Sequence, residues 1–183
     1  MLQRTVSRLN LGCGQRKLRE YINVDNNPLT KPEIIHDLNK FPYPFKNNCA
    51  DEILMDHVLE HTDSPLKVIE ELYRISKNNA VIIIRSPHFS CNWLHPGHKS
   101  AISSMLFDYF KHNGNDYYGN CNFEVKLIKL GWLRDPKHKG IILQSINMLI
   151  NLLANLNIGL CQRVWCYWVG GFEELYFKVK VLK

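Results

Sequence analysis

The 183-residue sequence lacks the features of a secreted, disulfide-stapled or repetitive chain. Its six cysteines form no Cys-x-x-Cys pair, and Cys91, His95 and His98 have no obvious fourth ligand, so we expect reduced thiols and no metal site. No repeat or low-complexity linker is visible, and the first strand is predicted within about eight residues of Met1, so we expect no signal peptide. These absences favour a single cytoplasmic domain covering residues 1–183.

Acidic residues are the minority charge. The chain has 23 Lys and Arg against 17 Asp and Glu, which gives a formal net charge of +6 and a pI near 9.0. This balance favours anionic partners such as phosphorylated metabolites, nucleic acid or lipid head groups. A hydrophobic content of 45% is enough for one full core.

Short apolar runs and one long amphipathic segment indicate the secondary structure. The helix signal is clearest at 64–79, where Ser64 is a suitable N-cap and Asn78 or Asn79 a suitable end. The "AVIII" run at 80–84 is typical of a parallel strand covered on both faces. Strands are predicted at 9–11, 21–25, 33–37, 51–55, 80–85, 122–132 and 173–183. The alternation predicts an α/β fold with a Rossmann-like, doubly wound sheet.

Residues 140–162 contain no charged side chain. Polar residues interrupt the segment, while apolar ones recur at helical spacing: Ile142, Ile146, Leu149, Ile150, Leu153 and Leu156. Three interpretations stay open, namely a buried or partner-facing amphipathic helix, a helix on a membrane surface, and a membrane span. A peripheral membrane contact or a homodimer through 140–162 is therefore a candidate partnership.

The stretch "RLNLGCGQRKLREYINVD" combines a glycine turn with an acidic residue that ends the next strand. Gly12 and Gly14 allow a sharp turn and a close ligand, and Asp25 can accept hydrogen bonds from ribose hydroxyls. A dinucleotide site would want a third glycine and a longer crossover. Here Lys17 takes the place of that glycine and Asp25 follows Gly14 by eleven residues. The pattern therefore favours S-adenosylmethionine over a nicotinamide cofactor, and an NAD-dependent oxidoreductase remains an alternative.

Several motifs in order carry a family resemblance: "LNLGCG", "YINVD", "HDL", "DEILMDHVLEH", "EELYRI", "AVIIIRSPH" and "GGFEELYFKVKVLK". Together they resemble a class I S-adenosylmethionine-dependent methyltransferase of the methyltransferase type 11 group. The resemblance implies a seven-stranded, mostly parallel sheet whose last strand is antiparallel. It also implies substrate-side insertions at about 87–118 and 133–170.

The resemblance assigns the cofactor site by position. Gly12, Cys13 and Gly14 would form the loop under the methionine part, with Asn10 near its amino group where the family often has aspartate. Asp25 would hold the ribose, Asp37 and Leu38 would sit by the adenine, and Asp56 and His57 would border the sulfonium. A second departure from the family is Lys77-Asn78-Asn79 in place of Pro-Gly-Gly.

Histidines are the candidate catalytic groups, because methyl transfer needs a base only when the acceptor is a hydroxyl or a protonated amine. We expect His57, His88 and His98 on the substrate side of the sheet. Asp56-His57-Val58-Leu59 stands where nucleic-acid amino-methyltransferases have Asn/Asp-Pro-Pro-Tyr, so a small-molecule or glycan acceptor is favoured over nucleic acid. A catalytically inactive domain that binds the cofactor or a partner is the second alternative.

Overall fold

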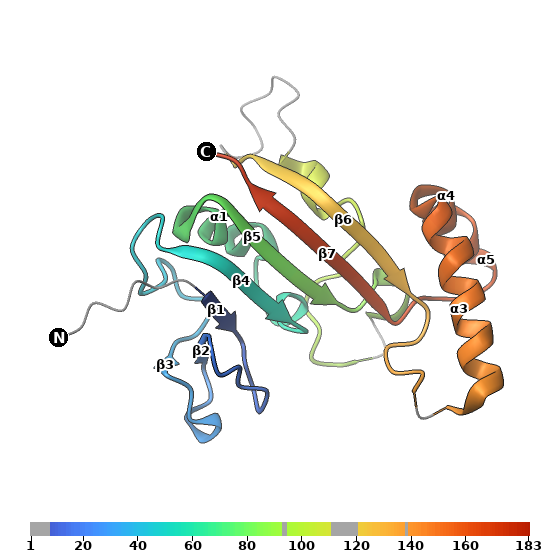
Figure 1. Cartoon of the computed structure of the whole chain (residues 1–183), viewed down its shortest axis with the longest axis horizontal. Coiled ribbons are helices and arrows are strands. Elements are labelled where there is room, and N and C mark those ends of the chain that lie inside the picture. Colours follow the sequence, from blue (N-terminus) through green and yellow to red (C-terminus); the bar gives the residue numbers. More distant parts are fainter. Residues whose placement is uncertain (1–7, 93–94, 111–120, 138) are drawn as a thin grey trace.

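The computed structural model describes residues 8–92, 95–110, 121–137 and 139–183, and within them one seven-stranded sheet has the order β3-β2-β1-β4-β5-β7-β6 (Figure 1). The strands are β1 (Arg8–Leu11), β2 (Ile22–Asp25), β3 (Ile34–Ile35), β4 (Ala50–Asp56), β5 (Ser76–Ser86), β6 (Phe123–Gly131) and β7 (Glu174–Val181). The first five pair in parallel, and β7 is antiparallel to both β5 and β6. This confirms the predicted α/β, Rossmann-like sheet with an antiparallel last strand.

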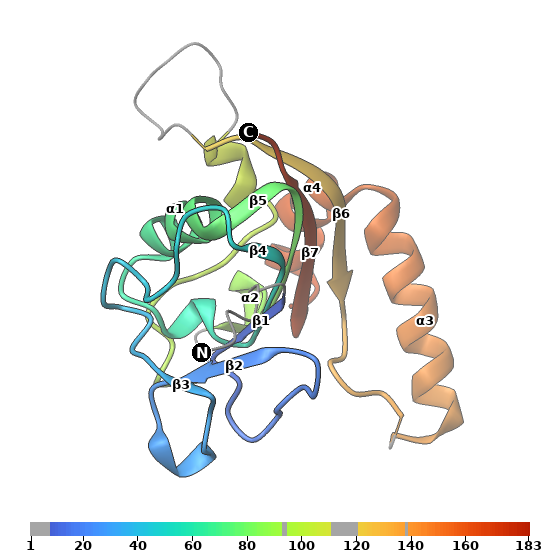
Figure 2. The same ribbon diagram turned by 60° about the vertical axis from the view of Figure 1, so that its left-hand side comes forward.

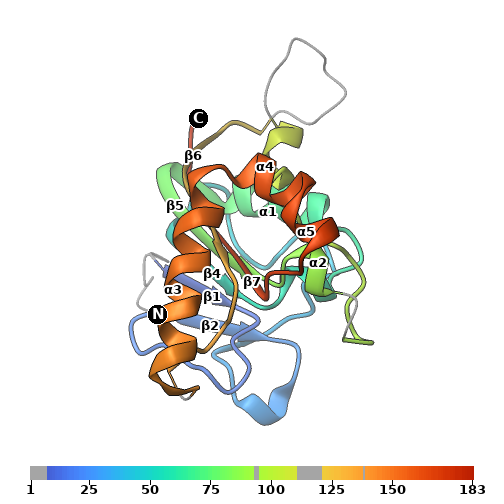
Figure 3. The same cartoon turned by 90° about the vertical axis from the view of Figure 1, so that its right-hand side faces the viewer.

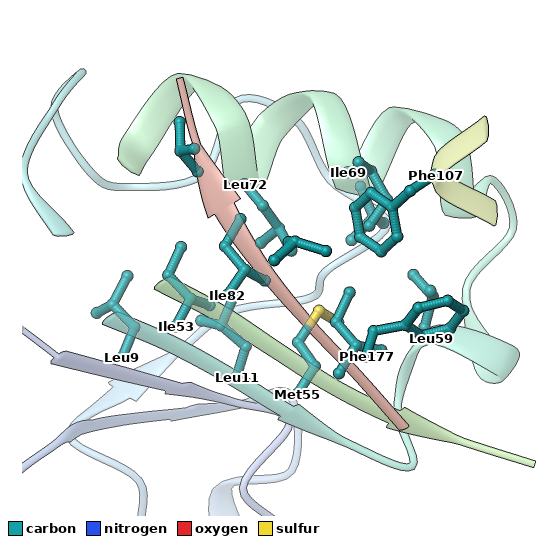
Figure 4. Packing of buried hydrophobic residues seen from close by; sticks show 14 of the residues in the cluster. Leu9, Leu11, Ile53, Met55, Leu59, Ile69, Leu72, Ile82, Phe107 and Phe177 are labelled. Carbon is teal, nitrogen blue, oxygen red and sulfur yellow. The ribbon is translucent and has the colours of Figure 1, made fainter. Parts of the chain in front are cut away.

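One face of the sheet carries the hydrophobic core. Helix α1 (Pro65–Ile75) lies over this face and packs Ile69 and Leu72 against strand residues such as Ile53 and Ile82 (Figure 4). The 3-10 helix Leu106–Phe110 adds Phe107. The alternation predicted for the last strand is confirmed, because its apolar set is fully buried: Leu175, Phe177, Val179 and Val181.

The opposite face is only partly covered, which corrects the expectation of cover on both faces. In β5, Ile82 and Ile84 are fully buried, whereas Val81 and Ile83 are partly exposed. The first α-helix in the continuous stretch 8–92 is α1, so the links between β1, β2, β3 and β4 contribute no α-helix. Figure 2 shows α1 and α3 (Gly140–Leu156) on opposite sides of β5 and β7.

The predicted end of the helix, the predicted start of β5 and the predicted strand at 33–37 were wrong. Helix α1 ends at Ile75, because the chain enters β5 at Ser76, whose N–H still bonds to Leu72 O. Asn79 does adopt a left-handed φ of 66°, but inside β5 and not as the end of the helix. Ser64 is the N-cap by position without a capping hydrogen bond from its side chain. The strand predicted at 33–37 is reduced to Ile34–Ile35.

The charge-free segment 140–162 forms α3 and α4 (Ile158–Arg163), followed by α5 (Trp165–Trp168). Figure 3 shows α3 beside β6, at the edge of the sheet. Its apolar residues are largely exposed, which excludes the interpretation of a helix buried in the chain's own core. Within the described residues no single helix has the length and apolar character to cross a membrane, although 140–156 and 158–168 together meet both criteria as a pair bent by 104°.

Candidate active site

A cleft of about 380 Å³ opens where β1, β2 and β4 end. The carboxyl ends of parallel strands meet at one edge of a sheet, and ligands of open α/β folds bind there. The lining residues come from the loops that follow β1, β2, β3 and β4: Gly12, Asp25, Asn26, His36, Asp37, Leu38, Asn39, His57, Val58, His61 and Thr62. Five of the predicted site residues are therefore brought together, namely Gly12, Asp25, Asp37, Leu38 and His57.

The turn after β1 depends on glycine at position 12. Gly12 has a φ of 69°, and the N–H groups of Gly12 and Cys13 both donate to Val24 O, at 2.8 and 3.0 Å. A Cβ on Gly12 would lie 2.7 Å from Val58 Cγ1 and closer still to Cγ2. The backbone of the turn after β1 therefore passes so close to Val58 that no side chain fits between them.

Asp25 connects this turn to the end of β2. Its Oδ2 accepts a hydrogen bond from Gly14 N at 2.8 Å, and its Oδ1 accepts one from Asn27 N at 2.9 Å. Each carboxylate oxygen keeps a second lone pair, and the residue lines the cleft. The geometry leaves Asp25 able to accept further hydrogen bonds from a ligand.

Four predicted cofactor residues lie behind the cleft and do not line it. Asn10 is buried and donates from Nδ2 to Arg16 O at 3.0 Å and to Asn23 Oδ1 at 2.8 Å, which fixes the loop that leaves β1. Asp56 pairs with Arg16 at 2.6 Å. The other two members are Cys13 and Gly14. These four residues stabilise the glycine turn. Asn10 and Asp56 use their polar atoms on partners within the chain, the Cys13 side chain is buried, and Gly14 has no side chain.

The side chains of His57, Glu60 and Ser86 form a row of polar contacts that the sequence did not predict. His57 has a φ of 57°, and its Nδ1 lies 3.4 Å from Glu60 Oε1. Glu60 is fully buried, and its Oε2 accepts a hydrogen bond from Ser86 Oγ at 3.2 Å. The motif "HVLEH" contains Glu60, but only the 3-10 helix Leu59–His61 shows that its side chain turns inward. Glu60 Oε1 makes no hydrogen bond, so the contact places a buried carboxylate beside the His57 ring without fixing the ring's orientation.

The rings of three histidines, His61, His95 and His98, lie close to one another near Glu60. The rings of His95 and His98 stack at 4.6 Å, and the ring of His61 lies 4.8 Å from that of His98. Among the described residues, the group that could hold a metal ion is Glu60, His61 and His98, whose ligand atoms lie within 4.8 Å of one another. His61 Nδ1 is 3.0 Å from Gly97 O, which would leave Nε2 as the ligand atom. Cys91 is not in the group, and the expectation of no metal stays a prediction.

His88 is placed in the core and not on the wall of the cleft. It is fully buried, with Nδ1 2.7 Å from Ser90 Oγ and Nε2 2.9 Å from Gln162 Oε1. Both ring nitrogens therefore have partners, and one of them comes from a helix 74 residues away in the sequence. This geometry favours a structural role over the predicted catalytic one. Predicted His98 is nearer the cleft, one ring behind His61.

The burial of His88 predicts a pH dependence of stability. Burial lowers the pKa of His88 from its usual value of 6.5, and the hydrogen bond that His88 Nε2 donates to Gln162 Oε1 opposes this shift. Below about pH 6.5 the unfolded chain takes up a proton that the folded chain resists, so the stabilisation is full above that pH and lost as the pH falls. We expect His88→Gln to flatten the fall in Tm between pH 7 and pH 5. The exposed His95→Gln is the control, and equal slopes for His88→Gln and the unmutated chain would contradict the assignment.

The strand order and the cleft define the class of fold. A sheet in the order 3-2-1-4-5-7-6 with β7 reversed, and a cleft at the carboxyl ends of β1 and β2, is the fold of class I S-adenosylmethionine-dependent methyltransferases. The family model described as a methyltransferase domain matches residues 9–84, which include β1 to β4, α1 and most of β5. The matched residues are less than half of the chain, and they include the residues that line the cleft.

Solved structures extend the likeness over almost the whole chain. A SAM-dependent methyltransferase from Archaeoglobus fulgidus is 18% identical with a TM-score of 0.54, and the match covers 95% of this chain and 86% of that one. One from Methanosarcina mazei is 12% identical with a TM-score of 0.57, covering 99% and 94%. One from Mesorhizobium loti is 9% identical with a TM-score of 0.57, covering 96% and 91%. A search of curated proteins finds no match.

The solved structures show that the chain has the fold of class I S-adenosylmethionine-dependent methyltransferases, and the methyltransferase-domain model matches the residues that build the cleft. The fold does not identify a methyl acceptor, since function lies in sites built on a shared fold.

Proposed function

We propose that the chain transfers a methyl group from S-adenosylmethionine to a hydroxyl or amine of a small-molecule or glycan acceptor. The observation that carries the proposal is the cleft at the ends of β1, β2 and β4, walled by the Gly12 backbone and the Asp25 carboxylate. Its volume of about 380 Å³ is in the range of small-ligand sites. A nucleoside-sized cofactor therefore fits the residues present.

The lining residues divide into proposed roles along the cleft. The Gly12 turn, which lines the cleft, would lie under the methionine part of the cofactor. Asp25 would accept hydrogen bonds from the ribose hydroxyls, and Asp37 with Leu38 would border the adenine. His36 and Asn26, which the sequence did not predict, line the same stretch. In this proposal Asn10, Cys13, Gly14 and Asp56 act by holding the turn.

The bound cofactor supplies an activated methyl group on its sulfonium. The chain has to align the acceptor, exclude water and, for a hydroxyl or a protonated amine, remove a proton. His57 is our candidate for proton removal, because it lines the cleft and Glu60 lies 3.4 Å from its Nδ1. His57 Nε2 is buried without a hydrogen-bond partner, so in this proposal Nδ1 accepts the proton and the Glu60 carboxylate beside it would stabilise the imidazolium that forms. His61 would face the acceptor, with His98 behind it.

Two measurements separate this proposal from its alternatives. Calorimetric titration should show binding of S-adenosylhomocysteine and none of NAD; the opposite result would point to an oxidoreductase. Radiolabelled methyl from S-adenosylmethionine should then enter small molecules or glycans of a metabolite extract. Cofactor binding with no labelled product under any extract condition would favour a catalytically inactive binding domain.

The role of His57 is tested by His57→Asn. Asparagine tolerates the left-handed φ of 57°, so the backbone should keep its path. Loss of a general base typically costs about 100-fold or more in rate, and we expect kcat to fall by about that factor while S-adenosylhomocysteine affinity stays within about threefold. His95→Asn, on an exposed residue outside the cleft lining, is the matched control. An unchanged kcat in His57→Asn would remove His57 from the mechanism.

A further inference from the structure

Helix α3 turns its polar side toward the protein. Asn147, Asn151 and Asn155 are spaced four apart and therefore share one side of the helix. Their Oδ1 atoms accept hydrogen bonds from backbone N–H groups at and after the end of β6: Leu133 at 3.1 Å, Trp132 at 2.7 Å and Leu130 at 2.9 Å. Asn155 Nδ2 also donates to Leu130 O at 2.8 Å. The three asparagines of α3 therefore satisfy backbone hydrogen-bonding groups at the edge of the sheet.

The outer side of the same helices is apolar. Met148 is 75% exposed and Trp168 is 84% exposed, and Ile141, Ile142, Leu156 and Tyr167 are also exposed. In a helix on the surface of a water-soluble domain the apolar stripe normally faces the core. Here the arrangement is inverted, and a contiguous apolar surface of this kind marks an interaction site. We call the exposed apolar side of α3, α4 and α5 the outer face.

An apolar groove lies between α3 and the two helices that follow it. Its volume is about 380 Å³, and its lining includes Leu153, Leu160, Trp165 and Phe172, with Asn157 as the sole amide side chain. The 104° bend between α3 and the segment 158–168 opens this space. A groove with such a lining suits hydrocarbon and offers almost nothing to a polar ligand.

The charges beside the outer face indicate what covers it. No Asp or Glu occurs from 136 to 172, while Lys137 and Lys139 precede α3 and Arg163 ends α4, all three exposed. We propose that the outer face docks on the surface of an anionic lipid bilayer, with the apolar side chains in the head-group boundary and the cations against lipid phosphates. Exposed Trp168 and Tyr167 suit that boundary, where aromatic residues with polar atoms concentrate.

A second copy of the chain fits this surface less well. A two-fold interface places the same patch on both partners, so the basic residues Lys137, Lys139 and Arg163 of both copies would come to one interface without an acidic residue of the segment to balance them. An anionic bilayer supplies the missing negative charge, and each basic residue near such a surface adds to binding. The charge pattern therefore favours the lipid surface.

Hydrogen bonds of Gln162 join α4 to the edge of the sheet that carries the cleft. Gln162 of α4 is buried, and its Oε1 accepts hydrogen bonds from Ser104 N at 3.0 Å and lies 2.9 Å from His88 Nε2. His88 follows β5 by two residues, at the carboxyl end of that strand. Docking would thus set the orientation of the cleft to the bilayer. The inference goes beyond the proposed function and does not depend on the acceptor.

Vesicle sedimentation of the full chain tests the proposal. We expect the chain to sediment with vesicles of phosphatidylcholine and phosphatidylglycerol, more weakly with pure phosphatidylcholine, and less at high salt because exposed charges are screened. The double variant Met148→Glu/Trp168→Glu should lower the partition coefficient about tenfold or more, since it puts carboxylates into the apolar boundary. Leu29→Glu, at a residue 81% exposed but outside the outer face, should bind as the unmutated chain does.

Three results would overturn the proposal. The chain would stay in the supernatant with both vesicle types, or the double variant would bind vesicles as well as Leu29→Glu does. In the third, sedimentation velocity would show a dimer that the double variant dissociates, with no vesicle binding, which would assign the outer face to a second copy. S-adenosylhomocysteine titration of the same samples reports on the cleft separately, so loss of docking and loss of the proposed methyl transfer are distinguishable.

Discussion

Gly12→Ala is expected to lower the free energy of unfolding by about 3 kcal/mol, as the sum of left-handed strain and overpacking. The strain arises because Gly12 has a φ of 69°. The overpacking arises because the new Cβ would stand 2.7 Å from Val58 Cγ1 and nearer to Cγ2. Val58 and Gly12 both line the cleft, so relief of the clash by movement of either should also weaken S-adenosylhomocysteine binding, by about 100-fold.

Gly14→Ala is the matched control for this prediction. Gly14 also has a positive φ, 49°, but a Cβ there would meet nothing within 4 Å. We therefore expect only the strain, about 1–2 kcal/mol, and a smaller loss of cofactor affinity. Adding Val58→Ala to Gly12→Ala should recover most of the difference, and urea unfolding of the unmutated chain, Gly12→Ala, Val58→Ala and the double variant measures the coupling. Equal destabilisation by Gly12→Ala and Gly14→Ala would contradict the close approach of Val58.

The sequence predicted the parts of the fold that local patterns control. Strands β1, β2, β4 and β7 were found near their predicted positions, because apolar runs and strict alternation act within a few residues. The turn at Gly12 and the acidic residue at the end of β2 could also be predicted, because both are local sequence features. The end of α1 was not, since Ser76 pairs with Ala50 of β4 and this long-range contact outweighs the local preference of Asn78 and Asn79.

The parts of the site that the sequence missed depend on distant partners. Glu60 is a candidate site residue because the Ser86 and His57 side chains lie beside its carboxylate, and the sequence shows neither contact. His88 does not line the cleft, and its Nε2 is hydrogen-bonded to Gln162, which belongs to a helix late in the chain. For α3 the helical spacing was correct, but periodicity alone does not say which side faces the protein. The orientation follows from hydrogen bonds between the asparagine side chains of α3 and backbone groups at and after the end of β6.

The second large effect concerns Asp25. Asp25→Ala removes the acceptor of both Gly14 N and Asn27 N, so we expect some loss of stability together with a fall in S-adenosylhomocysteine affinity of about 100-fold. Affinity alone would not show whether the carboxylate touches the ribose or only holds the turn. Asp51→Ala, on an exposed residue of β4 outside the cleft, serves as the control for the change in charge.

A modified ligand separates these two roles of Asp25. If the carboxylate accepts hydrogen bonds from the ribose, the unmutated chain should bind 2′,3′-dideoxy-S-adenosylhomocysteine about 30-fold or more weakly than S-adenosylhomocysteine, since hydrogen bonds to a charged acceptor contribute about 1.5–3 kcal/mol. Asp25→Ala should lose most of this discrimination, because the acceptor is gone. A variant that still separates the two ligands by the same factor would place the ribose elsewhere and leave Asp25 the role of fixing the Gly14 turn, with the cofactor held by other residues of the cleft.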